Sequence, residues 1–584
     1  MQALARVARM RVDLRHLVAF LLAAYAAIVL LAHSWLGSNY FVDIRVIGQI
    51  CLLVTALVAF LYLSPASALP HVYVVCFFFG LFVLVRLGQL VIAPSGSVSF
   101  PLPPYNGPQL QSALWQVLFG TVAFLLGIVA SARIPFRESA PAVRNLIKPA
   151  KPRRFLVGIA VVWLAGYVAS AVVLWHDSSI FITGYNQGSA VGWLVRLLDP
   201  DAVLIIAIVF LVRSRDLSQA QFTGALALIA LWVVFSTIGG SRGGALRIGT
   251  VAFFALIALM PARPISPVRL IGWAVLIGAL SIPTALLGQW SRYWQAGAPD
   301  ALAVSMREST AEKQAEFIER HRRAAQQREM EVDAEEARLA QLLQTLERSP
   351  VDSQARQRLM DEIERAKSKL PSLIAVASQY PPDKRAPYDA HCLTSVCRAY
   401  HAMVPILQRL GMIDYAVYTL AGRPDQQVVD QYLRSAYAAQ RIVNAAVPGT
   451  IFEGLDISTV QAVGMAFRNT GAKHAYENYS SEPWTLWGYA KLVFGPAAGM
   501  ISIFLAGFVL QLAFSVVSLA PQEVRDLART SFLFLVTYRV IDFFGPDHFA
   551  MVIIHYGIAL STTYVLVIVI AALLDERKAG RLSA

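Results

Sequence analysis

Apolar residues dominate long stretches of this chain, and polar residues are concentrated between them. A helix needs about 20 mostly apolar residues to cross a bilayer. By that measure the pattern predicts twelve spanning helices, at 17–36, 46–64, 70–93, 112–131, 155–175, 201–213, 220–238, 245–261, 270–289, 488–515, 530–545 and 550–573. The sixth and eleventh are short or polar. We therefore expect an all-α fold, a polytopic transmembrane helical bundle.

Basic residues mark one side of this predicted bundle, as they do in loops that face the cytoplasm. They precede the first span, occur in the connection between spans four and five, and recur in every second connection after that. These basic residues are Arg6, Arg9, Arg11, Arg15, Arg133, Arg137, Arg144, Lys148, Lys151, Arg153, Arg154, Arg213, Arg215, Arg263, Arg269, Arg525, Arg529, Arg577, Lys578 and Arg581. The opposite connection 94–111 carries no charge. We expect both termini in the cytoplasm, which in a bacterium makes this an inner-membrane protein. The first apolar segment lacks a small-residue cleavage site, which favours a retained anchor.

One long hydrophilic region, 291–487, separates spans 1–9 (1–290) from spans 10–12 and a cytoplasmic tail (488–584). The topology makes it a periplasmic loop. Its first part, 303–370, is rich in good helix formers and carries an apolar stripe on each side of residues 349–352, namely Leu339, Leu342, Leu346, Leu359, Ile363, Ala366 and Leu370. This spacing predicts a long antiparallel helical hairpin. Alternating charges usually mark a solvated surface, so a solvated hairpin is favoured over an arm that docks a partner.

The second part of the loop, 372–487, is less regular and more aromatic, and we expect a mixed helical segment. It contains Cys392 and Cys397 close together in the motif HCLTSVC. In an oxidising periplasm the pair is a disulfide candidate. His391 and His401 leave a metal site open as a weaker alternative, because the spacing fits no known zinc motif.

Composition supports a membrane protein: 57% of the 584 residues are hydrophobic and 15% are charged. The loop 291–487 contains 23 basic and 24 acidic residues, which leaves 27 basic and 13 acidic residues for the rest of the chain. The net charge of +13 therefore belongs to the membrane part, where it indicates topology and contact with anionic lipid. Nothing in its distribution indicates nucleic-acid binding.

Two arginines interrupt an apolar stretch in TIGGSRGGALRIG, residues 237–249. The topology places Arg242 at the periplasmic turn between spans seven and eight, with Arg247 about 7 Å further along the next helix. Four glycines expose backbone amides beside a helix N-terminus, which attracts anions, and guanidinium groups bind phosphate in a bidentate way. The motif predicts a phosphate site at the outer leaflet. The alternative is a short hairpin whose arginine only extends to the lipid headgroups.

Other polar residues are expected on the same side of the membrane. The candidates are Arg86, Arg292, Arg434, Arg441, Arg468, His474, Glu477, Arg539 and Asp542. Asp542 has an equally good interpretation as the structural partner of Arg539, and each charged residue of the loop, taken alone, is more typical of a surface than of a catalytic site. The sequence contains no metal motif, no nucleotide-binding loop and no GxSxG elbow, so we expect chemistry without a cofactor, on an activated lipid-linked donor.

The residues that follow 448 resemble those of a known family. Pro448 and Gly449 form a Pro-Gly turn, residues 480–483 form a polar Ser/Pro segment, and Tyr489 precedes the FGPAAG entry into the next span at 494–499. Together with GGSRGG, this is similar to the O-antigen or exopolysaccharide repeat-unit polymerase (Wzy) family, related to O-antigen ligases. The motifs cover about a fifth of the chain. Two departures are the charged hairpin and the absence of the family glutamate before Tyr489.

The resemblance implies a glycosyltransferase that polymerises undecaprenyl-diphosphate-linked repeat units at the periplasmic face, for O-antigen, capsule or exopolysaccharide. Arg242 and Arg247 would stabilise the leaving diphosphate, and His474 or Glu477 would take the proton of the acceptor hydroxyl. Arg86, Arg292, Arg434, Arg441, Arg468, Arg539 and Tyr489 would bind substrate. The implied partners are the lipid-linked glycan, the bilayer and a chain-length regulator or other assembly protein. An O-antigen ligase, a polysaccharide or lipid transporter, and a scaffold are the alternatives.

Overall fold

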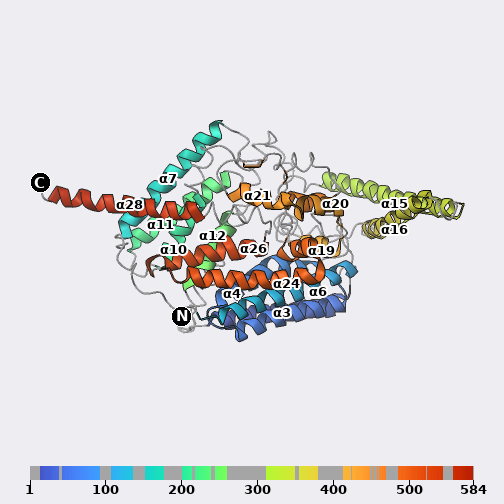
Figure 1. Ribbon diagram of the computed structural model, residues 1–584, viewed down its shortest axis with the longest axis horizontal. Coiled ribbons are helices and arrows are strands. Elements are labelled where there is room, and N and C mark those ends of the chain that lie inside the picture. Colours follow the sequence, from blue (N-terminus) through green and yellow to red (C-terminus); the bar gives the residue numbers. More distant parts are fainter. Residues whose placement is uncertain are drawn as a thin grey trace.

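The computed structural model describes residues 13–38, 42–92, 107–135, 152–176, 200–213, 218–238, 244–259, 311–348, 354–378, 412–422, 424–446, 451–452, 457, 459–468, 485–520, 522–542 and 557–582. All regular structure in these segments is helical (Figure 1), as the sequence predicts.

The described N-terminal residues contribute four helices to the bundle, each antiparallel to the one before it in the chain. They are α2 (Leu14–Leu36), α3 (Ile44–Leu63), a continuous third helix, and α6 (Gly107–Ala132); the third helix comprises α4 (Leu69–Phe78), the π-helix η1 (Phe79–Leu84) and α5 (Val85–Ile92). Asp13 and Asp43 cap the first two helices by accepting hydrogen bonds from backbone amides of the first turn, which is the ordinary N-cap role of aspartate.

The described residues in the middle of the chain add four helices, α7 (Pro152–His176), α10 (Pro200–Arg213), α11 (Gln219–Ile238) and α12 (Gly244–Leu259). Phe253 and Phe254 on α12 pack against Phe77 of α4, at ring-centroid distances of 5.0 and 5.6 Å. The described C-terminal elements are α24 (Leu486–Val517), α25 (Gln522–Ser531), the π-helix η3 (Phe532–Tyr538), α26 (Arg539–Asp542) and α28 (Gly557–Leu582).

Six of the described helices are long and apolar enough to cross a membrane: Leu14–Leu36, Ile44–Leu63, Leu69–Val91, Gly107–Ala132, Leu486–Val517 and Gly557–Leu574. They coincide with six of the twelve predicted spans. Predicted spans 155–175, 201–213, 220–238 and 245–261 also lie on helices, α7, α10, α11 and α12, and shorter apolar stretches occur at Ala202–Leu211, Gln219–Val234 and Ile248–Ala258. Span 270–289 lies outside the described residues. The described part of the eleventh predicted span, 530–542, lies on the end of α25, on η3 and on α26.

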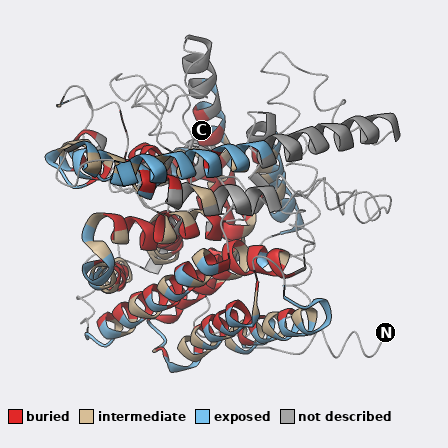
Figure 2. Ribbon diagram, turned by 90° about the vertical axis from the view of Figure 1, so that its right-hand side faces the viewer, coloured by how far each residue is buried: buried red, intermediate tan, exposed pale blue. Residues whose placement is uncertain are grey.

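The third helix is the centre of the bundle, with 72% of its spanning window buried against 22% for α2 and for Gly557–Leu574. Figure 2 shows buried residues gathered inside the bundle and exposed residues on its outer surfaces. The exposed apolar side chains of α2, such as Leu31 and Trp35 at 69% and 92% exposure, are those expected to face lipid.

Close contact between α6 and α24 depends on small residues. A Cβ added at Gly127 would overlap the Phe504 carbonyl oxygen, and one at Gly507 would overlap that of Phe124. Small residues at a crossing let helix backbones approach each other, the usual basis of helix packing in membranes.

The charged hairpin forms as predicted, from α15 (Ala311–Arg348) and α16 (Gln354–Ser378), which lie side by side (Figure 1). Ile363 and Ala366 of the predicted apolar stripe are buried between the arms. The second arm continues past the predicted end at 370 to Ser378, through Pro371. In Figure 1 this hairpin and the C-terminal half of α28 project from opposite ends of the molecule.

The remaining described elements of the loop are α19 (Met412–Ala421), α20 (Gln426–Val428), the π-helix η2 (Val429–Leu433), α21 (Ala436–Ala446) and α22 (Thr459–Arg468). Their apolar residues form a second, smaller core, which we call the loop core; it consists of Val429, Leu433, Ile457, Ala462, Val463, Met465, Ala466, Tyr489 and Leu492.

Candidate functional site

Helix α19 comes from the hydrophilic region of the sequence, yet it packs inside the membrane bundle. Its residues Ile413, Ala416, Val417 and Leu420 are at most 3% exposed and belong to the same apolar core as the spanning helices. Its neighbours are α5, η1, α6 and α24. A segment of the predicted periplasmic loop is therefore built into the bundle.

A buried ion pair joins this helix to the third spanning helix. The side chains of Arg86 on α5 and Asp414 on α19 are both 1% exposed. Arg86 Nε lies 3.0 Å and Nη2 lies 3.0 Å from Asp414 Oδ2, and Nη1 donates to Gln89 Oε1 at 2.6 Å. This is a charge-assisted, forked contact of the strong kind. Asp414 also lies in the first turn of α19, where a negative charge is favoured by the helix dipole.

The other end of α19 contacts α24. The backbone carbonyl of Leu420 accepts hydrogen bonds from Gln116 Nε2, at 3.2 Å, and from Lys491 Nζ. Gly488 lies directly against Thr419, so that a Cβ there would overlap the threonine side chain. Because the last carbonyls of a helix have no partner within it, the two donors satisfy one of these groups, the Leu420 carbonyl, inside the bundle.

Helix α24 is broken where a continuous span had been predicted at 488–515. Gly495 adopts φ 79° and ψ 178°, and Pro496 follows it. Proline supplies no amide hydrogen for the helix ladder, and only glycine adopts this positive φ without strain. The FGPAAG segment predicted as the entry to the span thus contains the break.

The two arms of α24 lie against each other. We call 486–494 the first arm and 496–517 the second arm. In a continuous helix Ala490 and Gly499 would be about 13.5 Å apart. Instead, a Cβ added at Gly499 would lie 3.0 Å from the Ala490 carbonyl oxygen. The chain therefore reverses at Gly495, and the first arm is a short helix inserted beside α6 and α19.

The first arm connects the bundle with the loop core. Leu486, Trp487 and Ala490 belong to the bundle core, whereas Tyr489 and Leu492 belong to the loop core. Trp487 packs over Phe79 of η1, at a ring-centroid distance of 5.6 Å. One helix of nine residues thus has one side in each core.

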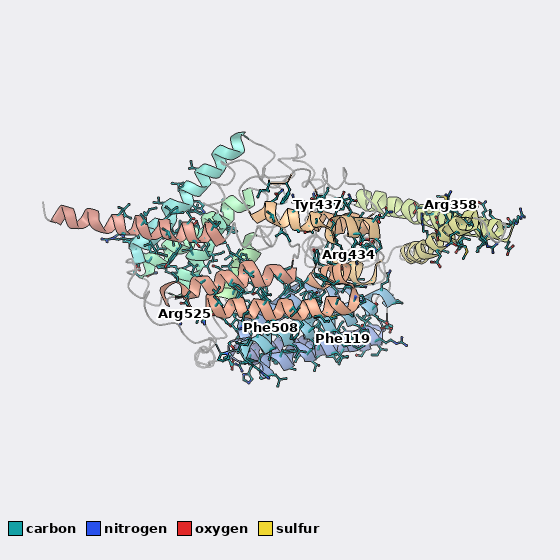
Figure 3. All side chains as sticks on the ribbon, viewed as in Figure 1. Phe119, Arg358, Arg434, Tyr437, Phe508 and Arg525 are labelled. Atoms are coloured by element: carbon teal, nitrogen blue, oxygen red, sulfur yellow. The ribbon has the colours of Figure 1, made fainter. Side chains whose placement is uncertain are left out.

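Arg434, labelled in Figure 3, binds the C-terminal end of this arm. Its Nε donates to the Val493 carbonyl at 2.9 Å and its Nη2 to the Leu492 carbonyl at 2.6 Å, while Nη1 pairs with Asp430 at 2.9 Å. A cation at a helix C-terminus is favourable and satisfies carbonyls that lack intrahelical partners.

The structure shows the side-chain exposure of four predicted substrate-binding residues. Arg86 and Tyr489 are buried, at 1% and 5% exposure, Arg434 is exposed and Arg441 on α21 is half-buried. Arg86 contacts α19, Arg434 binds the end of the first arm of α24, and Tyr489 lies on that arm. Arg86 and Arg434 both bind protein groups there, which is a structural use of their charge; their substrate contacts stay a prediction.

Other predicted site residues are described only in their backbone or not at all. Arg247, Arg468 and Arg539 lie on α12, α22 and α26. The catalytic candidates Arg242, His474 and Glu477, the substrate-binding candidate Arg292, and the disulfide candidates Cys392 and Cys397 lie outside the described residues. Cys51 and Cys76 are free thiols. Among the described side chains no group of His, Cys, Asp or Glu could hold a metal ion.

Three polar residues at this junction were absent from the sequence prediction: Asp414, Lys491 and Gln116. Asp414 had one signal, since it is the one charge in the otherwise apolar stretch GMIDYAVYTL. An isolated carboxylate in such a stretch needs a buried partner. Arg86, also isolated in an apolar segment, is that partner, but only the fold brings the two together.

Comparison with known proteins finds no family model, curated protein or solved structure that matches this chain.

Proposed function

We propose that this protein is a membrane glycosyltransferase that polymerises undecaprenyl-diphosphate-linked oligosaccharide repeat units at the periplasmic face of the bacterial inner membrane. The observation that carries the proposal is the insertion of α19 and the first arm of α24 into the apolar core of the spanning helices. An enzyme whose donor is anchored in lipid and whose acceptor is a sugar needs such a junction between bundle and extramembrane segment.

In this reaction the acceptor hydroxyl oxygen forms a bond to the anomeric carbon of the donor glycan, and the bond from that carbon to the diphosphate breaks. His474 or Glu477 takes the hydroxyl proton. The negative charge that develops on the diphosphate is stabilised by Arg242 and Arg247. These roles come from the sequence resemblance.

The test substitutes Arg242→Ala and uses Arg215→Ala, in a predicted cytoplasmic loop, as the matched control. We expect the Arg242 variant to accumulate in the membrane at the normal level but to make no long surface polysaccharide, because a guanidinium group that offsets developing charge contributes on the order of 10²–10³-fold in rate. The readout is the length distribution of surface polysaccharide on gels. Normal polymer from the Arg242 variant would contradict the assignment.

The break in α24 favours a transporter as the second candidate, since transporters use discontinuous helices to build binding sites. The lipid-linked species that accumulate on gene deletion distinguish the candidates. Single repeat units at the outer face indicate a polymerase, and long unattached chains at the outer face indicate a ligase. Species retained at the inner face indicate a transporter.

A further inference from the structure

The ion pair between Arg86 and Asp414 does more than neutralise two buried charges. Helix α19 contacts the bundle through an apolar side made of Ile413, Ala416, Val417 and Leu420. Apolar contact is non-directional, so this side fixes the position of α19 along its axis less tightly than a polar contact does. A forked guanidinium–carboxylate contact, in contrast, has a strict geometry. With two nitrogens of Arg86 at 3.0 Å from one carboxylate oxygen, the position of Asp414 fixes the register of α19.

That register is transmitted to α24. Thr419 and Leu420 are one to two turns beyond Asp414 on the same helix. Thr419 contacts Gly488, and the Leu420 carbonyl accepts a hydrogen bond from Lys491; Gly488 and Lys491 are both on the first arm of α24. A shift of α19 by one residue would move the Leu420 carbonyl by about 1.5 Å and remove its alignment with both Lys491 and Gln116.

The first arm in turn holds the loop core. Tyr489 and Leu492 are buried in that core, and Arg434 binds the arm's last carbonyls. From Asp414 to Tyr489 and Leu492, every step is therefore a direct contact between buried or half-buried groups, and the exposed Arg434 adds a further contact to the end of the arm.

We propose that Asp414 is a positioning residue that acts through Arg86. Their ion pair sets the register of α19, and α19 sets the position of the first arm of α24 and of the loop residues attached to it. The kinetic consequence rests on the proposed function, because the loop carries the acceptor-side candidates His474 and Glu477. The structural consequence is independent of that function.

Disulfide cross-linking between α19 and the first arm measures the register directly. In a background with Cys51, Cys76, Cys392 and Cys397 replaced by Ala, Thr419→Cys is combined with Gly488→Cys. An ideal Cβ at Gly488 lies 2.6 Å from Thr419 Cβ, so the two backbones must move apart by about 1–2 Å to reach the roughly 3.5–4.5 Å of a disulfide. We expect rapid oxidation in membranes.

Adding Asp414→Asn should slow this oxidation at least fivefold, because the amide keeps the shape of the side chain but loses the charge. The matched control is Asp430→Asn, the same change in the exposed ion pair with Arg434, which should leave the rate unchanged. Cross-linking of the Asp414 variant at the unmodified rate would overturn the proposal.

A second variant covers the case in which Asp414→Asn does not accumulate in the membrane. Arg86→Met with Asp414→Leu removes both charges, so neither is left buried and unpaired, and this protein should fold. If the ion pair sets the register, this variant also cross-links at least fivefold more slowly. Cross-linking at the unmodified rate would mean that shape alone positions α19, and the proposal would be wrong.

The kinetic measurement uses purified protein in liposomes with lipid-linked repeat units. Asp414→Asn should lower kcat about tenfold and change KM less than threefold, since a misplaced loop impairs the reaction more than initial binding. Unchanged kcat would contradict positioning. If the unmodified protein forms no polymer, the proposed function fails, and the cross-linking rates still decide the role of Asp414.

Discussion

The third spanning helix buries two ionisable side chains near its opposite ends, and the fold accommodates them in different ways. Arg86 is 1% exposed and meets the carboxylate of Asp414, 328 residues away in sequence. His71 is fully buried and its Nδ1 lies 3.0 Å from Thr537 Oγ1 of η3, between the rings of Phe514 and Phe532. One environment supplies a counter-charge and the other a neutral hydroxyl.

The difference reflects what each group costs to bury. A guanidinium group stays charged and needs a charged partner to offset its desolvation. An imidazole is stable in its neutral form, for which one hydroxyl partner satisfies one ring nitrogen. The partner of His71 comes from another helix of the bundle, whereas the partner of Arg86 comes from the hydrophilic segment 291–487. The Arg86 end of the bundle therefore depends on that segment.

Among these buried and half-buried polar contacts, removing the counter-charge of Arg86 should lower the free energy of unfolding most. Asp414→Leu leaves Arg86 buried without its partner, and we expect a loss of about 3–5 kcal/mol in the free energy of unfolding. Unfolding by SDS in mixed micelles measures it. Arg86→Met in the same protein should recover most of the loss. A single variant as stable as the unmodified protein would show that Arg86 does not need Asp414.

Removing the hydroxyl should have a smaller effect. Thr537→Val keeps the shape of the side chain but leaves His71 Nδ1 without that partner, at a cost of about 1–3 kcal/mol. The same unfolding titration measures it, and adding His71→Phe should reduce the loss because no polar ring remains. If Thr537→Val cost as much as Asp414→Leu, the distinction between charged and neutral burial would be wrong.

The smallest effect is expected for a cation that is partly exposed. Arg434→Gln removes the charge at the C-terminal end of the first arm of α24, where the side chain of Arg434 is 38% exposed. Water can replace its hydrogen bonds, so we expect about 0.5–1 kcal/mol. The thermal midpoint of the detergent-solubilised protein is a sufficient readout. A loss above that of Thr537→Val would indicate that the arm depends on Arg434 more than on its apolar contacts.

Local sequence patterns predicted much of the helical architecture. Six predicted spans correspond to long apolar helices, and the hairpin stripe buries Ile363 and Ala366 as expected. The same reasoning missed the break at Gly495, because the sequence stays apolar on both sides of that residue. It also missed Asp414, because a single charge in an apolar segment does not show which residue it pairs with. Arg86 and Arg434 were expected near substrate, and the structure adds the carboxylate and carbonyl groups that they bind.

The sequence by itself determined that the chain is helical and which stretches are apolar enough to span a membrane. It also determined that a long charged hairpin separates two groups of these stretches. These properties follow from residues within a few turns of each other. Only the tertiary structure decided that α19 enters the bundle, that α24 folds back on itself, and that Arg86 meets Asp414. Those contacts join residues far apart in the chain, and what selects them is the cost of burying a charge or an unpaired carbonyl, which depends on the whole surrounding fold.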